Sequence, residues 1–273
     1  MQELTDLSRL SLNTATTQRW SLAEAAEGCA RAGIPWIAPW RDKVAQAGLA
    51  ASARLVRDAG LKVSSLCRGG FFPARSAAER QARIDDNLRA IDEAAALGTD
   101  LLVLVCGPAP DKDIAAARGM VADGIAAALP YAAQCGVRLG IEPLHPMYAA
   151  DRSVIVTLAE ANALVERFAS PWLGVVADVF HTWWDPDLDA QIARAGRNIL
   201  AFHINDWLVP LPDPLLGRGM MGDGAIDLRG IRAKVEAAGY TGPIEVEIFN
   251  QAIWDAPGDE VLARMCQRYR ECV

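Results

Sequence analysis

The repeated order helix, glycine, strand is the feature that most constrains the fold of this chain. At five places an Ala-rich amphipathic stretch ends at a glycine, and a short apolar run follows at once. Glycine is favoured just past the last turn of a helix because it adopts the left-handed conformation without a Cβ clash. These glycines are Gly33, Gly60, Gly98, Gly136 and Gly239.

The apolar runs predict eight strands that alternate with eight helices. Ser21, with Glu24 three residues later, forms a capping box that starts the first helix. The strands are expected at 9–14, 34–40, 61–67, 100–106, 137–144, 173–178, 198–205 and 242–249. The helices are expected at 21–32, 44–59, 76–97, 114–135, 157–168, 185–195, 227–238 and 259–272.

Eight such units without an intervening linker predict an α/β fold of the (β/α)8 TIM-barrel type, with one domain over residues 1–273. The length agrees, since a barrel of this kind takes about 250 residues. An open doubly wound sheet is the alternative. It is disfavoured because neither a GxGxxG nor a GxxxxGK[ST] pattern follows any predicted strand.

Charge and composition exclude several classes of partner. The net charge of −7 argues against a basic nucleic-acid-binding surface. No apolar run reaches the roughly 18 residues of a membrane span, and residues 1–6 lack a signal-peptide pattern. We therefore expect a cytoplasmic protein with neither nucleic acid nor membrane as partner. Six cysteines without CxxC spacing are expected to be buried, although Cys67 and Cys106 lie near strand ends and are candidates for a pocket wall.

One apolar strand ends in a carboxylate that needs a partner. Residues 173–177 are apolar, Asp178 follows them, and His181 comes three residues later. Burial of an unpaired carboxylate costs several kcal/mol or forces its protonation. A cationic group is therefore expected at this strand end.

Four successive strands, the fifth to the eighth, carry a side chain able to bind metal near their carboxyl ends. Adjacent strands lie about 4.8 Å apart, and barrel active sites form at this end, so the side chains can converge. Three carboxylates and one imidazole favour one divalent ion: Mn²⁺ first, with Mg²⁺, Co²⁺ or Zn²⁺ as alternatives. For each residue alone, a salt bridge or a solvated rim position is the alternative. The candidate ligands are Glu142, Asp178, His203 and Glu247.

The order of these residues, together with the loop GDGAIDL at 222–228, resembles the xylose-isomerase-like TIM-barrel superfamily. More narrowly, it resembles the sugar phosphate isomerase/epimerase group, which includes ketose 3-epimerases and hydroxypyruvate isomerases. The resemblance implies that Glu142, Asp178, His203 and Glu247 hold the metal, and that Glu142 and Glu247 also act as the catalytic acid/base pair. The implied reaction moves a proton next to a carbonyl through a metal-stabilised enediolate of a sugar or keto-sugar. We expect a non-phosphorylated substrate, because no Gly-rich turn with an adjacent lysine marks a phosphate grip.

Further substrate contacts are expected at the mouth of the barrel. The resemblance makes His181 a donor to a substrate oxygen and, more loosely, assigns Arg218 to the substrate. Trp184 and Trp254 fall near strand ends and are candidates to wall a sugar pocket. The alternatives are a histidine packed against tryptophan, a solvated loop arginine, and aromatic side chains that pack between helices.

His145, in the sequence IEPLHP, departs from the epimerase pattern. That stretch is similar instead to a branch that contains the catalytic subunits of C-glycoside deglycosidases and related 3-keto-glycoside lyases. The likeness makes His145 a candidate base for β-elimination. A loop histidine bonded to backbone is the alternative.

Other classes of protein fit the sequence less well. An abasic-site endonuclease of the same superfamily would need more histidines than His145, His181 and His203. A non-catalytic sugar-binding module would be expected to lack Glu142 or Glu247. A homo-oligomer or a heteromeric partner subunit is compatible with the sequence.

Two supporting interactions are also predicted inside the barrel. Arg138 and Glu245 share the inward face of their strands and are expected to form a buried ion pair or network. Asp206 follows the histidine strand and is expected to orient His203.

Overall fold

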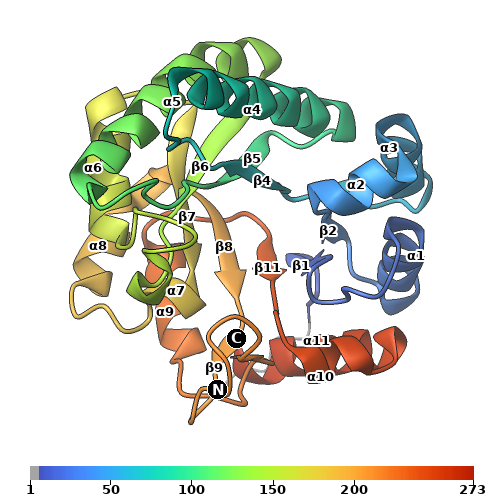
Figure 1. The fold of residues 1–273 in the computed structure, drawn as a ribbon. Coiled ribbons are helices and arrows are strands. Elements are labelled where there is room, and N and C mark those ends of the chain that lie inside the picture. Colours follow the sequence, from blue (N-terminus) through green and yellow to red (C-terminus); the bar gives the residue numbers. More distant parts are fainter. Residues whose placement is uncertain (1–5) are drawn as a thin grey trace.

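The computed structural model describes residues 6–273, which form a barrel of parallel strands inside a ring of helices (Figure 1). Residues 1–5, most of the segment in which no signal pattern is expected, lie outside the described residues. The predicted (β/α)8 TIM-barrel class is confirmed.

The barrel has eight parallel positions, and its third strand is divided in two. β3 pairs with β2, β4 pairs with β5, and an isolated parallel bridge between Trp40 and Cys67 links the end of β2 to β4. The break falls where the sequence predicts one strand at 61–67. The barrel strands are β1 (Leu10–Asn13), β2 (Trp36–Ala38), β3 (Lys62–Val63), β4 (Leu66–Gly70), β5 (Leu101–Val105), β6 (Arg138–Glu142), β7 (Leu173–Asp178), β8 (Ile199–Ile204) and β11 (Ile244–Val246).

The helices follow the predicted order, with one division. The expected helix at 44–59 is two helices, because Gly48 has φ +81° and interrupts the helical backbone. The helices that cover the barrel are α1 (Leu22–Ala32), α2 (Arg41–Ala47), α3 (Leu49–Asp58), α4 (Ala77–Leu97), α5 (Ile114–Cys135), α6 (Leu158–Phe168), α8 (Leu188–Ala195), α9 (Leu228–Ala237) and α11 (Gly258–Cys272).

The predicted helix ends are confirmed. Ser21 and Glu24 form the capping box of α1, and Ser76 does the same with Glu79 for α4. All five glycines predicted after helices have positive φ, between +70° and +106°. Local capping therefore sets most of the boundaries between helix and strand.

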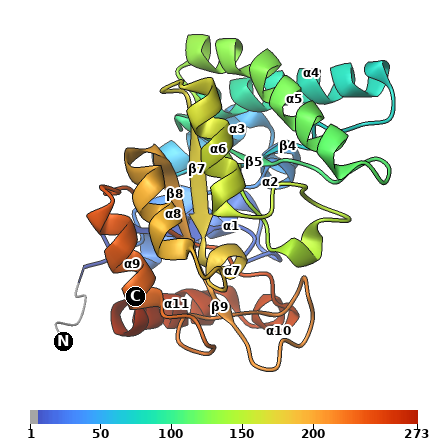
Figure 2. The same ribbon diagram turned by 90° about the vertical axis from the view of Figure 1, so that its left-hand side faces the viewer.

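Short elements gather at the carboxyl ends of the strands. In Figure 2 the arrow of β7 points toward α7 (Val179–Thr182) and β9 (Asp206–Trp207). β9 pairs antiparallel with β10 (Arg218–Gly219), and α10 (Gln251–Asp255) follows the last barrel strand. None of these is predicted from sequence, because each is too short to show a periodic pattern. Two short 3-10 turns, η1 (Pro146–Tyr148) and η2 (Gly196–Asn198), complete the described structure.

The expected ion pair between Arg138 and Glu245 is wrong. The Arg138 guanidinium turns outward and lies 2.7 Å from Asp100 Oδ2, with 34% of its side chain exposed. Glu245 is 1% exposed and points into the barrel. The two-residue period puts both residues on one face, yet a long arginine side chain reaches solvent at the strand start instead of remaining buried.

Among residues 6–273, no helix combines the length and the apolar character that a bilayer span requires.

Gly70 tests how tightly the end of β4 is built. Its φ is +98°, and an added Cβ would lie 2.0 Å from the carbonyl oxygen of Val105. We expect Gly70→Ala to lower the free energy of unfolding by about 2–5 kcal/mol, because the clash is with backbone and cannot relax through a side chain. Gly119→Ala is the matched control. It lies on the exposed side of α5 with nothing within 4 Å of the added Cβ, and we expect a gain of up to about 1 kcal/mol. Urea unfolding of both variants measures the difference, and equal stabilities would contradict it.

Candidate metal centre

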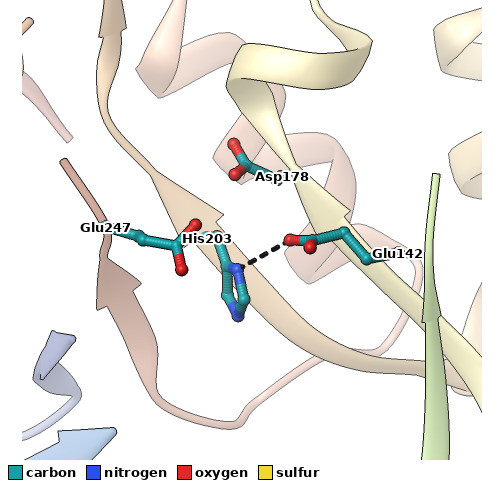
Figure 3. Close-up of side chains that lie close together, drawn as sticks. All are labelled: Glu142, Asp178, His203 and Glu247. Carbon is teal, nitrogen blue, oxygen red and sulfur yellow. Dashed lines mark hydrogen bonds and ion pairs between the residues drawn. The ribbon is translucent and has the colours of Figure 1, made fainter. Parts of the chain in front are cut away.

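Four buried side chains meet at the carboxyl ends of the strands (Figure 3). Glu142 ends β6, Asp178 ends β7, His203 lies in β8, and Glu247 follows β11. One ligand atom from each lies within 4.8 Å of those of the others, and none of the four residues is more than 4% exposed. The sequence predicts this convergence, and the structure shows it.

Polar neighbours orient the carboxylates so that one oxygen of each faces the centre. Asp178 Oδ1 accepts hydrogen bonds from the Phe180 backbone N–H at 2.8 Å and from the Asn205 side-chain amide at 3.2 Å. Glu247 Oε1 accepts from the Asn13 amide at 3.0 Å. Asp178 Oδ2 and Glu247 Oε2 are therefore left to face a cation.

His203 lies between two carboxylates. Its Nδ1 is 3.1 Å from Glu142 Oε1, and its Nε2 is 3.5 Å from Glu245 Oε1. Glu245 lies beside His203 in the register of β11 with β8, and Asn13 donates to it at 2.7 Å. A carboxylate behind a histidine fixes the ring and raises its basicity as a ligand.

Asp206, predicted to orient His203, has a different role. Its carboxylate accepts from the backbone N–H groups of Gly222, Gly224 and Ile226 at 2.9–3.1 Å, and so holds the loop after β10. Glu245 takes the predicted role instead. The spacing along the chain suggested Asp206, whereas strand register brings Glu245 to the ring.

Arg218 supplies positive charge at the centre of the cluster. Its Nη1 is 2.9 Å from Glu247 Oε2 and 3.0 Å from Asp178 Oδ2, and the residue is 5% exposed. The rings of Phe180 and Phe249 each lie 4.9 Å from its guanidinium carbon. The side chain is thus buried between aromatic faces, and the alternative of a solvated loop arginine is wrong.

The site holds more negative than positive groups, and the pKa values reflect this. Burial raises the pKa of Glu142 to about 7. Burial alone would lower the pKa of His203, but the carboxylates of Glu245 and Glu142 raise it to about 10. Four carboxylates thus face two cationic side chains, His203 and Arg218.

This donor set fits a divalent cation. Asp178 Oδ2 and Glu247 Oε2 face the centre, where both contact Arg218. His203 Nδ1, beside Glu142, points to the same place. Oxygen-rich sites with one imidazole suit Mn²⁺, Mg²⁺ or Co²⁺, and Zn²⁺ also accepts such ligands. Glu142, Asp178, His203 and Glu247 are the residues that would hold the ion.

The cluster opens into a cavity at the carboxyl ends of the strands. Two of the carboxylates, Glu142 and Glu247, line it, and so do His181 and Arg218. Trp40 and Phe249 form an edge-on aromatic pair in its wall, with ring centroids 5.5 Å apart. The other lining residues are Cys67, Arg68, Val105, Leu144, Tyr148, Arg152 and Leu215.

His181 is buried at the cavity wall and is neutral. Burial lowers its pKa to about 3. Its Nδ1 accepts from the His145 backbone N–H at 3.1 Å, so a neutral ring carries its hydrogen on Nε2. That nitrogen lies 3.1 Å from Arg218 Nη2, which is also a donor. The contact between His181 and Arg218 is therefore mismatched.

The structure does not bring His145 into the cavity. Its ring packs between Trp184 and Trp207, with centroids 5.4 and 5.1 Å away, and its Nδ1 accepts from the Met147 backbone N–H at 3.2 Å. The predicted role as a substrate base thus has no support from its position, which fits the alternative of a loop histidine bonded to backbone.

Trp184 and Trp254 also stand behind the cavity wall. The indole N–H of Trp184 donates to the carbonyl of His181 at 2.8 Å, and that of Trp254 donates to the carbonyl of Ala15 at 2.7 Å. Neither residue lines the cavity. Their predicted contact with substrate is therefore not supported, because each indole turns away to satisfy its donor.

The cavity includes residues that the sequence did not single out as a group. Arg68 and Arg152 lie at its rim, and Tyr148 comes from the 3-10 turn after β6. Cys67 lines it as considered above, but burial raises the pKa of its thiol well above the usual value, so it is not a nucleophile. Cys106 is buried and does not line the cavity.

A family model described as "Xylose isomerase-like TIM barrel" matches residues 26–272. The chain belongs to this family.

Curated proteins and solved structures resemble the chain to different degrees. The 3-dehydroshikimate dehydratase of Pseudomonas aeruginosa is 33% identical over 220 residues, 75% of this chain. The match spans only 32% of that protein, so the chain corresponds to about a third of it. The crystal structure of protein SMc04130 from Sinorhizobium meliloti 1021 is 56% identical, has a TM-score of 0.96, and is covered over 98% of this chain and 99% of its own. The IolI protein with a bound zinc atom shares the xylose isomerase-like fold, with a TM-score of 0.84 and 20% identity, over 96% of this chain and 97% of its own.

Metal affinity should rise with pH. In the metal-free protein His203, with a pKa of about 10, carries a proton at neutral pH, and Glu142, with a pKa of about 7, carries one below that. Binding to His203 Nδ1 must displace the first proton, and ligation by Glu142 displaces the second. We expect the Mn²⁺ association constant to rise about tenfold per pH unit between pH 7 and 8, and more steeply below pH 7. Calorimetric titration in two buffers of different ionisation enthalpy measures the released protons. A pH-independent affinity would contradict this.

Arg218 should compete with the metal. Its guanidinium holds the two carboxylate oxygens that the ion needs, and its contact with His181 is mismatched. We expect Arg218→Gln to raise Mn²⁺ affinity at least about tenfold and to lower metal-free stability, because buried carboxylates then lose their counter-ion. Arg54→Gln, on the exposed side of α3, removes the same charge and should leave both quantities unchanged. Weaker Mn²⁺ binding in Arg218→Gln would show that the guanidinium supports the ion instead.

Proposed function

We propose that this member of the xylose isomerase-like family is a divalent-metal-dependent enzyme that isomerises or epimerises a hydroxy ketone, by proton transfer at the carbon next to the carbonyl. The observation that carries the proposal is that Glu142 and Glu247, two carboxylates of one metal-competent cluster, line the same cavity. A pair of carboxylates around a substrate carbon can remove a proton and return one.

Glu142 and Glu247 together carry out the proton transfer. One carboxylate, Glu142 or Glu247, takes the proton, and the electron pair of the broken C–H bond moves to the carbonyl oxygen. Return of a proton by the other carboxylate to the opposite face inverts the carbon, as the electron pair returns from the oxygen. Return to the neighbouring carbon exchanges ketone and hydroxyl when the hydroxyl proton also moves to the former carbonyl oxygen. A divalent ion, when bound, supplies positive charge that stabilises the developing oxyanion.

Two donors at the cavity wall favour the same chemistry. The neutral His181 ring presents its Nε2–H, and Arg218 presents a guanidinium that aromatic rings hold in place. Both can donate to substrate oxygens as negative charge develops there. The aromatic pair of Trp40 and Phe249 adds an apolar surface to the cavity wall.

Elimination of water is a second candidate function. Two of the curated relatives that match this chain are 3-dehydroshikimate dehydratases, and the one from Pseudomonas aeruginosa is 33% identical. The first step would be the same proton removal, after which hydroxide leaves from the next carbon. His145 is not needed as the base for such a step, because Glu142 and Glu247 already reach the cavity and His145 does not.

Solvent exchange and ultraviolet absorbance separate the two candidates. In D₂O with Mn²⁺, an isomerase or epimerase incorporates deuterium next to the carbonyl of a ketose and forms the isomer without losing water. A dehydratase instead removes water from 3-dehydroshikimate and forms an aromatic product, seen as new absorbance. Absence of both exchange and elimination across a panel of ketoses and cyclic hydroxy ketones would overturn the proposal.

Glu247→Gln tests the carboxylate pair. We expect deuterium exchange to fall at least about 100-fold at saturating Mn²⁺, because the amide cannot accept the proton. Asp178→Asn, which alters a candidate ligand outside the acid/base pair, should lose activity at low Mn²⁺ and recover much of it at high Mn²⁺. Glu27→Gln, 72% exposed on α1, is the charge-matched control and should behave as the unaltered protein. Full activity in Glu247→Gln with metal bound would rule out the two-carboxylate scheme.

A further inference from the structure

Two arginines line the cavity without a close ion pair to any described residue. Arg68 follows the bridge between β2 and β4, and its guanidinium carbon lies 4.0 Å from the centre of the Phe71 ring. Among residues 6–273, no ion pair or side-chain hydrogen bond is formed by Arg68. Arg152 has only a 3.8 Å contact with its chain neighbour Asp151, and its buried Nε has no hydrogen-bond partner.

A neighbouring arginine, in contrast, has two close acidic partners. Arg41, which lies in the adjoining groove, is bound by Glu93 at 2.6 Å and by Asp86 at 2.9 Å. That arginine is fully occupied in holding α2 against α4. Burial lowers the pKa of Arg68, and the positive charge of Arg152 lowers it further. The two guanidinium groups are therefore close enough to repel each other. Two like charges on a half-buried wall cost free energy unless an anion arrives between them.

Arg68 lies between the inner cavity and an adjoining groove and lines both. It lines the inner cavity with Glu142 and Glu247, and it also lines a wider groove that shares Trp40, Cys67 and Phe249 with that cavity. A molecule whose reacting carbon lies at the carboxylates would therefore extend toward Arg68 and Arg152.

We propose that Arg68 and Arg152 form an oxyanion subsite, which binds a carboxylate or phosphate carried by the substrate at the end away from the proton-transfer carboxylates. The proposal rests on the proposed function, since it takes the inner cavity as the substrate site. It narrows the expected neutral keto-sugar to an anionic hydroxy ketone. Guanidinium groups bind both oxyanions through charge-assisted, often paired hydrogen bonds.

The subsite also gives the substrate a direction. Arg68 and Arg152 line the same cavity as Glu142 and Glu247, and there the carboxylates repel an anionic group while the two guanidinium groups attract it. An anionic substrate is thereby turned so that its uncharged carbonyl end faces Glu142 and Glu247. The same arrangement disfavours the reversed orientation, which would place like charges together.

Binding of three six-carbon probes tests the subsite without requiring turnover. D-gluconate, D-glucitol 6-phosphate and D-glucitol share a polyol chain and differ in carrying a carboxylate, a phosphate or no charge. We expect at least one of the two anions to bind the purified full-length protein about tenfold or more tightly than D-glucitol, as measured by calorimetry. The anion that binds more tightly than D-glucitol shows whether the subsite prefers a carboxylate or a phosphate.

Two variants locate the preference. Arg68→Gln and Arg152→Gln should each weaken the preferred anion about tenfold and leave D-glucitol binding unchanged. Arg68→Lys, which keeps the charge without the planar fork, should retain part of the affinity. Arg54→Gln, on the exposed side of α3, is the charge-matched control. Thermal midpoints and circular dichroism identify any variant that is misfolded, and the other variant then carries the test.

The outcomes separate this inference from the proposed function. Equal binding of all three probes overturns the subsite, and so does an anion preference that Arg68→Gln and Arg152→Gln leave intact. If neutral ketoses exchange deuterium while neither anion binds more tightly than D-glucitol, the subsite is wrong and the proton-transfer function stands. If the anion preference depends on both arginines but no ketone exchanges, the proton-transfer function fails while the anion site remains.

Discussion

The need to compensate buried negative charge organises this end of the barrel. Four carboxylates lie within one buried region. Neighbouring hydrogen-bond donors contact them and favour their ionised form, as at Asp178 and Glu247. Such groups would otherwise protonate or destabilise the fold. Burial raises the pKa of Glu142 to about 7, and the carboxylates of Glu245 and Glu142 raise the pKa of His203 to about 10 against the effect of burial. A divalent cation is the partner that this buried negative charge fits best.

The strands and the loops contribute different parts of the site. The strands fix Glu142, Asp178 and His203 through parallel register, which pairs Asp178 directly with His203. The loops bring Arg218 on a two-stranded ribbon, which Asp206 holds by accepting from three backbone N–H groups. Strand positions are rigid and determine where a proton is moved. Loop positions determine which molecule is held there.

The sequence predicted the barrel and the four-residue cluster because both follow from periodicity. A strand places alternate residues inward, and parallel strands bring their carboxyl ends together, so the location of Glu142, Asp178, His203 and Glu247 needs no knowledge of side-chain conformation. Predictions that depended on side-chain direction did less well. His145, Trp184 and Trp254 lie at the right end of the barrel, yet each turns away to satisfy a hydrogen bond or a ring contact.

The interactions that the sequence missed are those made across the barrel. Glu245 reaches His203 through the pairing of β11 with β8, whereas Asp206, three residues from His203 in the chain, does not. Arg68, in β4, and Arg152, in the loop after β6, are more than eighty residues apart and come to one cavity only when the barrel closes. No local pattern announces such pairs, because their proximity is set by the closure of the fold.

One cavity of this kind can support several outcomes from a single first step. Removal of a proton next to a carbonyl leaves an electron-rich carbon whose fate depends on what lies beside it: a second proton donor favours isomerisation or inversion, and a leaving hydroxyl favours elimination. Glu142 and Glu247 supply the proton chemistry for either outcome. The choice therefore falls to the groups that orient the substrate above them, Arg218 and His181 on one side and the two rim arginines on the other. A change of reaction within this architecture needs only a change in how the substrate is held, while the strand-end carboxylates stay as they are.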